Sequence, residues 1–132
     1  MRLAKYKKEN KELITYLLFE AGDERGFIDG VKSEIDTQFE AMNQSNVYFI
    51  KKSLRKTLRI ANKHIKYSGL KQTEAELLIY FCLKMKSSDL PIRSSTVLNN
   101  LYSRQIERIK KAVASLHEDI QYDFKDDIES LI

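Results

Sequence analysis

Apolar side chains recur at steps of three and four residues along most of this chain, which is the spacing of one face of an α-helix. The clearest stripe advances by 3, 4, 4 and 3 residues and consists of Ile28, Val31, Ile35, Phe39 and Met42. Only four glycines and one proline occur among 132 residues. An all-β fold needs many tight turns, and this chain has few of the residues that form them. The sequence therefore predicts an all-α protein.

Turn and cap residues divide the chain into five helices and a short terminal turn of helix ending near Ile132. The expected helices cover residues 6–21, 23–43, 47–67, 73–86 and 94–123. Gly22 and Gly69 would end the first and third helices, and Thr73 with Glu76 has the spacing of a capping box for the fourth. A chain of 15.5 kDa suits one domain. We expect a single all-helical domain over residues 1–132, either a compact bundle or a short helical-repeat-like array of five to six helices.

The most apolar segment, residues 77–83, has the length of a buried strand or of part of a buried helix. Its near lack of β-branched residues and the preceding capping box favour a helix. Residues 13–19 are similarly apolar, so we expect the first and fourth helices to lie at the centre. The pentapeptides 12–16 and 76–80 are alike, which leaves a duplicated helical unit as an alternative to a chance match.

The expected fifth helix carries a short coiled-coil-like pattern that advances by 3, 4, 3 and 4 residues. Its members are Ile106, Ile109, Val113, Leu116 and Ile120. This pattern is a candidate seam for a homodimer. Phe124, Ile128 and Leu131 follow it and are expected to point inward.

The net charge of +4 conceals a strong segregation of charge along the chain. Residues 1–19 carry +3, residues 20–40 carry −5 and residues 72–132 carry −2. Residues 47–71 hold eight basic side chains and no acidic one, which gives +8. The third helix is therefore the strongest candidate for contact with an anionic partner.

Seven cations of the third helix fall within an arc of about 140° when residues are placed at about 100° intervals. We call this set the basic ridge: Lys51, Lys52, Arg55, Lys56, Arg59, Lys63 and Lys66. The core face of the same helix lies opposite and consists of Ile50, Leu54, Leu58, Ala61 and Ile65. Such a ridge could bind phosphates of a nucleic-acid backbone without reading sequence.

The alternative is that the ridge is a solvated face or is neutralised within the chain. Its partners would be Asp29, Glu34, Asp36 and Glu40 of the second helix, or the acidic residues between Glu118 and Glu129. Aromatic residues flank the ridge, but Phe49 and Tyr67 share an angular position with Ile60, so they are expected to pack inward. The sequence contains no sign of base recognition.

Few residues suit catalysis or metal binding. His64 and His117 lie in no HExxH or CxxC pattern, and Cys82 sits in the most apolar segment, where burial disfavours a nucleophilic thiolate. No glycine-rich phosphate loop follows a strand. We expect no enzymatic activity, no metal and no cofactor.

The segment LRKTLRIANKHIKYSGLKQTEAELLIYFCLKM, residues 54–85, resembles a family of small uncharacterised all-helical bacterial proteins, a domain of unknown function. In that family a basic helix of the form R-K-x-L-R-x-A-N/Q-K-x-I-K precedes a short turn and a very apolar helix. The resemblance implies a cytosolic, helical-repeat-like bundle and assigns no role to any residue.

These observations predict a non-enzymatic helical interaction or scaffold protein with an unknown protein partner. The alternatives are non-specific binding of RNA or DNA through the basic ridge, and a homodimer built on the fifth helix. A single cysteine cannot form an internal disulfide, and no apolar run has membrane-spanning length. The N-terminal residues lack a signal-peptide core. A cytoplasmic location without membrane contact is therefore expected.

Overall fold

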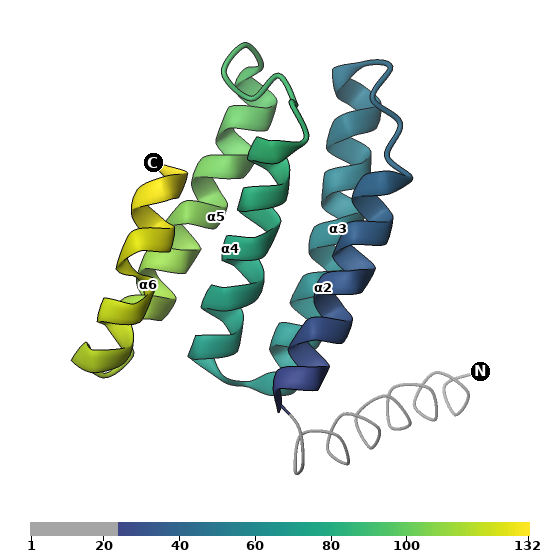
Figure 1. Ribbon diagram of the computed structural model, residues 1–132. Coiled ribbons are helices and arrows are strands. Elements are labelled where there is room, and N and C mark those ends of the chain that lie inside the picture. The colour runs from purple at the N-terminus through teal and green to yellow at the C-terminus, as the bar shows by residue number, and fades with distance from the viewer. Residues whose placement is uncertain (1–23) are drawn as a thin grey trace.

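A computed structural model describes residues 24–132, which form five α-helices and contain no strand (Figure 1). The helices are α2 (Glu24–Glu40), α3 (Val47–Ser68), α4 (Lys71–Ser87), α5 (Thr96–Ala114) and α6 (Glu118–Leu131). The predicted all-α class is confirmed. The expected helix at 6–21 and the first of the two similar pentapeptides lie outside the described residues.

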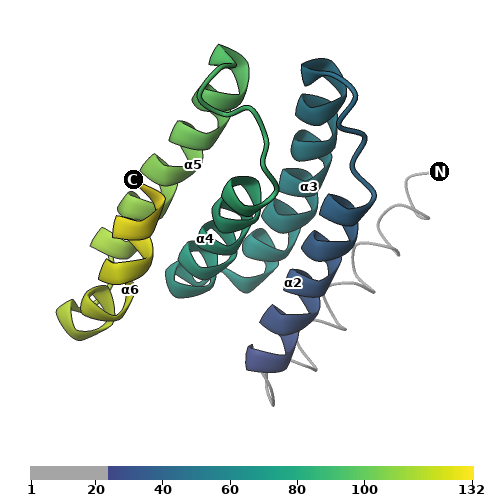
Figure 2. The ribbon, with the colours of Figure 1, turned by 45° about the horizontal axis from the view of Figure 1, so that its top comes forward.

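Consecutive helices run in alternate directions, and each of them contacts the helix that precedes it among the described residues (Figures 1 and 2). Helices α2 and α3 form one antiparallel pair, and α5 and α6 form another. Helix α4 contacts all four of these helices, while α6 contacts α4 and α5 but neither α2 nor α3. One cluster of buried side chains extends from Ile28 to Leu131 through all five helices.

Helix α4 is central because its apolar residues point in almost every direction. Leu77, Leu78, Phe81, Cys82 and Met85 are fully buried. The ring of Phe81 meets Phe39 of α2 edge to face, with 5.7 Å between ring centroids. The preference for a buried helix over a strand at residues 77–83 is confirmed.

The ends of α3 follow from its own cap residues. Asn46 has an extended backbone, and its side chain accepts a hydrogen bond of 3.1 Å from the Phe49 amide, which satisfies a free donor of the first turn. Gly69 ends the helix in the left-handed conformation, with φ of 66°, and its amide donates to the carbonyl of Ile65. The predicted end of this helix at Gly69 is confirmed.

Two predicted boundaries near α2 and α4 differ from the structure. Helix α2 ends at Glu40 rather than Asn43, because the Asn43 side chain accepts from the Ser45 amide and forms a turn. Helix α4 begins at Lys71, so Thr73 lies inside the helix and the capping box is wrong. Thr73 instead donates a 2.6 Å hydrogen bond to Glu24, at the start of α2.

The predicted long helix from 94 to 123 is wrong, because the chain turns at residues 115–117. Ser115 donates from its hydroxyl to the Ala112 carbonyl at 2.6 Å, and the side chain of His117 caps α6 by accepting from the Asp119 amide at 3.2 Å. The turn lets α6 fold back, which buries Phe124 and Leu131 and packs Ile128 against the core. The inward placement of these three residues is confirmed.

The candidate dimer seam is divided by the same turn. Three of its members lie in α5, Leu116 lies in the turn and Ile120 lies in α6. Ile109 and Val113 are buried, while Ile106, Leu116 and Ile120 pack partly buried against the core. The pattern therefore packs at least in part within one chain, and a homodimer built on it stays a prediction.

Candidate anion-binding groove

The two faces of α3 separate as the sequence predicts. All five residues of the core face, Ile50, Leu54, Leu58, Ala61 and Ile65, are buried. Six of the seven cations of the basic ridge are exposed, and Lys51 is half-buried. The apolar face holds α3 against the bundle, so the ridge must face outward along its length.

Most of the basic ridge has no acidic partner in the part of the chain that the structure describes. Within residues 24–132, no ion pair joins a carboxylate to Lys51, Lys52, Arg55, Lys56, Arg59 or Lys66. These cations also stand three or four residues apart on one helix, where like charges repel.

The carboxylates that were candidates to neutralise the ridge lie elsewhere. In α2, Asp29 pairs with Arg25. Glu34 meets the imidazole of His64, and Asp36 pairs with Lys84 of α4 at 2.9 Å. The acidic residues of α6 cannot reach the ridge directly, because α6 packs on α4 and α5 and does not contact α3. Among the described residues, these segments therefore form no ion pair with Lys51, Lys52, Arg55, Lys56, Arg59 or Lys66.

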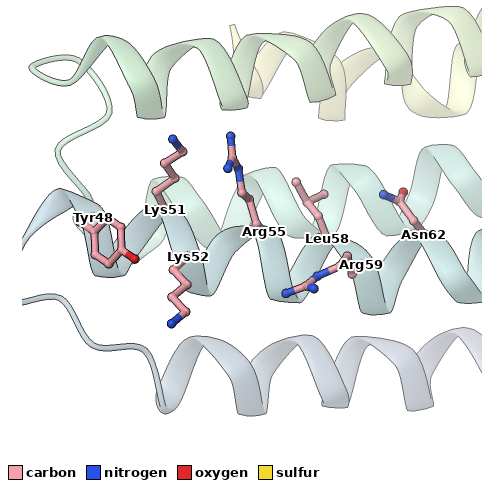
Figure 3. A pocket seen from close by; sticks show the side chains of 7 residues that line it. All are labelled: Tyr48, Lys51, Lys52, Arg55, Leu58, Arg59 and Asn62. Carbon is pink, nitrogen blue, oxygen red and sulfur yellow. The ribbon is translucent and has the colours of Figure 1, made fainter.

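Four cations of the ridge line an open groove of about 590 Å³ on the outer side of α3 (Figure 3). Lys51 and Arg55 extend toward α5, whereas Lys52 extends toward α2. The full lining is Tyr48, Lys51, Lys52, Arg55, Leu58, Arg59 and Asn62. A chain of phosphates lying along α3 would have cations on both sides.

A second concavity of about 300 Å³ continues the groove toward α5. It shares Lys51 and Arg55 with the first and adds Asn100 and the exposed Arg104. Sequence reasoning does not join these α5 residues to the ridge, because no local pattern links two helices that are separated along the chain by the whole of α4.

The end of the groove that lies toward the α3 C-terminus is tied together by Arg108 of α5. Its guanidinium donates to Asn62 of α3 at 2.9 Å and to Gln105 at 3.2 Å, and it lies 3.5 Å from Glu74 of α4. One side chain therefore connects three helices. Its hydrogen bond to Asn62 joins α5 to α3 at this end of the groove.

The opposite end of the groove carries two aromatic side chains. Tyr48 is 66% exposed and Phe49 is 38% exposed. Their rings meet edge to face, with centroids 5.4 Å apart. The expectation that Phe49 packs inward is wrong, because it lies in the first turn of α3 and its ring packs on Tyr48 instead. Tyr67, at the other end of the helix, is half-buried.

The residues considered for catalysis have structural surroundings. His64 lies 3.2 Å from Glu34 and edge to face with Phe27, and His117 caps α6. Burial of the Cys82 thiol raises its pKa to about 12. Among the described residues, no three His, Cys, Asp or Glu side chains gather as metal ligands, and none of the helices there combines the length and apolarity that a membrane span requires.

No family model matches the chain, and neither a curated protein nor a solved structure matches it. The resemblance over residues 54–85 therefore stays a prediction.

Proposed function

We propose that this protein is a non-enzymatic interaction domain that binds the phosphate backbone of a nucleic acid along α3. The observation that carries the proposal is a set of six cations on one face of α3 that have no carboxylate partner within residues 24–132, four of which line one groove. Ammonium and guanidinium groups bind phosphate oxygens through charge-assisted hydrogen bonds, and a row of them matches a chain of phosphates.

The energetics of the isolated helix support a polyanionic partner. Lys51, Arg55 and Arg59 stand four residues apart, and each such like-charged pair destabilises a helix by about 0.2–0.5 kcal/mol. A bound phosphate chain would reverse the sign of this term and would release condensed counterions. Binding by this route depends strongly on salt and only weakly on sequence.

The proposal is tested by fluorescence anisotropy with a labelled DNA duplex at about 50 mM salt, where phosphate contacts are strong. We expect micromolar or tighter binding that falls by about 10³-fold between about 50 and 200 mM salt, as six phosphate contacts would give. The double variant Arg55→Glu, Arg59→Glu should weaken binding by at least about 100-fold. Inorganic polyphosphate should compete with the duplex.

A matched control reverses two exposed cations of α5 and α6. The variant Lys110→Glu, Lys125→Glu changes the net charge equally, and neither residue lines the groove. It should keep most of the affinity. The groove variant should stay folded by circular dichroism, because a carboxylate introduced in place of Arg55 stands four residues from Lys51 and forms a favourable pair with it. Absence of binding to both duplex and polyphosphate at low salt, or equal loss in the two variants, would overturn the proposal.

The wider expectation of an interaction protein agrees with this proposal, because the groove is a surface for a partner and no reaction is assigned to it. A cytoplasmic location, which the single cysteine favours, would place nucleic acids within reach. A protein with an acidic surface would bind the same cations. Competition by polyphosphate therefore tests whether the groove binds phosphate groups, whichever macromolecule is the labelled ligand.

A further inference from the structure

We infer that the groove is built for a single-stranded nucleic acid, with an unpaired base stacked on Tyr48. This inference rests on the proposed function and adds to it the kind of strand that binds. Its basis is the position of Tyr48, which lines the same groove as Lys51 and Lys52 and stands at its end (Figure 3).

Tyr48 is one of two strongly exposed tyrosines among the described residues, the other being Tyr122 of α6. Tyr48 is 66% exposed, whereas Tyr80 and Tyr102 are half-buried and donate hydrogen bonds to Asp36 and to the Leu131 carbonyl. No hydrogen bond within residues 24–132 involves the Tyr48 side chain. The ring of Phe49 supports one part of Tyr48 edge to face and leaves the rest open.

An aromatic ring beside a row of cations matches the two chemical parts of a single strand. The phosphates bind the cations, and a base stacks on the ring with little regard to its identity. Bases within a duplex are already stacked and paired, so they cannot make this contact without being extruded. The aromatic ring therefore favours an unpaired strand, which the cations alone would not distinguish from a duplex.

The length of the site sets the size of the strand. Lys51 and Lys66 are fifteen residues apart, which corresponds to about 22 Å along a helix. At the rise of about 3.4 Å per nucleotide that one strand has in duplex DNA, this length corresponds to about six nucleotides, and an extended single strand would cover it with fewer. Tyr48 lies one helical turn before the first cations, so one further nucleotide would reach the ring.

The test compares three labelled ligands of about 16 nucleotides: a thymidine strand, the same backbone without bases, and a duplex. We expect the thymidine strand to bind about tenfold more tightly than the abasic strand. The variant Tyr48→Ala should remove that advantage and leave abasic and polyphosphate binding unchanged, whereas Tyr48→Phe should keep it. A structural role for Tyr48 would instead change all ligands together.

The matched control is Tyr122→Ala, because Tyr122 of α6 is 76% exposed and lies outside the groove. It should bind all ligands as the unmodified protein does. Equal binding of thymidine and abasic strands, unchanged by Tyr48→Ala, would overturn the single-strand inference and leave phosphate binding intact. Failure of every ligand, polyphosphate included, would overturn the proposed function itself.

Discussion

Two regions of this molecule use charge in opposite ways. Between α2 and α4 the charged groups are paired across the helices: Arg25 and Lys32 reach Glu76, and Lys84 reaches Asp36. Tyr80 joins the same set by donating a 2.6 Å hydrogen bond to Asp36. On the outer face of α3, by contrast, six cations have no carboxylate partner within residues 24–132.

This difference separates charges that pair between helices from charges that have no carboxylate partner within residues 24–132. The α2–α4 pairs connect two helices that are separated along the chain by the whole of α3, so removing one member removes a contact between these helices. The groove cations repel one another along a single helix. Removal of the groove cations should therefore weaken binding without lowering the free energy of unfolding. Substitutions in the two regions test this difference.

The largest effect is expected at the centre of the bundle, on which both regions depend. Phe81→Ala should lower the free energy of unfolding by about 3–5 kcal/mol, because the fully buried ring leaves a cavity against Phe39. Urea unfolding measures this loss. Leu83→Ala, at a partly exposed position of the same helix, should lower the free energy of unfolding much less. Equal effects of the two substitutions would contradict the full burial of Phe81 in the core.

A smaller effect is expected in the paired region, and it should depend on pH. Burial opposes ionisation of Asp36, but the Tyr80 and Lys84 contacts outweigh it and lower the pKa of this carboxyl below its ordinary value of 3.8. Asp36→Asn should therefore destabilise the protein by about 1 kcal/mol at about pH 7, a value kept small by partial exposure.

The sign of the pH dependence follows from the lowered pKa. The stabilisation by Asp36 is present above pH 3.8 and is lost as the pH falls through the pKa of the folded state, so the two proteins should converge in strongly acidic solution. Asp123→Asn removes an exposed carboxylate of α6 and should have little effect at any pH. A difference between Asp36→Asn and the unmodified protein that persists unchanged at about pH 2 would contradict the charge-based account.

The sequence predicted those features that depend on neighbours along the chain. The ends of α3 follow from the residues that flank it, and the ridge follows from helical spacing alone. The break between α5 and α6 was missed because residues 115–117 contain neither glycine nor proline, and the apolar pattern continues through them. There a histidine caps the new helix, and the burial of Phe124 and Leu131 stabilises the reversal.

Only the α3 part of the candidate site was predicted, again because sequence patterns report neighbours along the chain. Periodicity identifies which α3 side chains share a face, but it does not identify what stands beside that face. Arg104 and Asn100 join the groove only because α4 holds α5 next to α3. The α2–α4 pairs were likewise missed, since Glu76 was assigned to a cap and its partner Arg25 lies 51 residues away.

The smallest effect on stability is expected for the groove arginines, which contrast most directly with the paired Arg25. Arg55→Ala with Arg59→Ala should change the free energy of unfolding by less than about 0.5 kcal/mol, because these exposed guanidinium groups have no ion pair among the described residues. The change should be toward higher stability at low salt, since like-charge repulsion is relieved, and should vanish at high salt.

Arg25→Ala provides the contrast and should be destabilising, because Arg25 pairs with both Glu76 and Asp29. Thermal melts at two salt concentrations measure both variants. A destabilisation of the groove variant equal to that of Arg25→Ala would mean that the ridge stabilises the fold, and the separation between the two regions would be wrong.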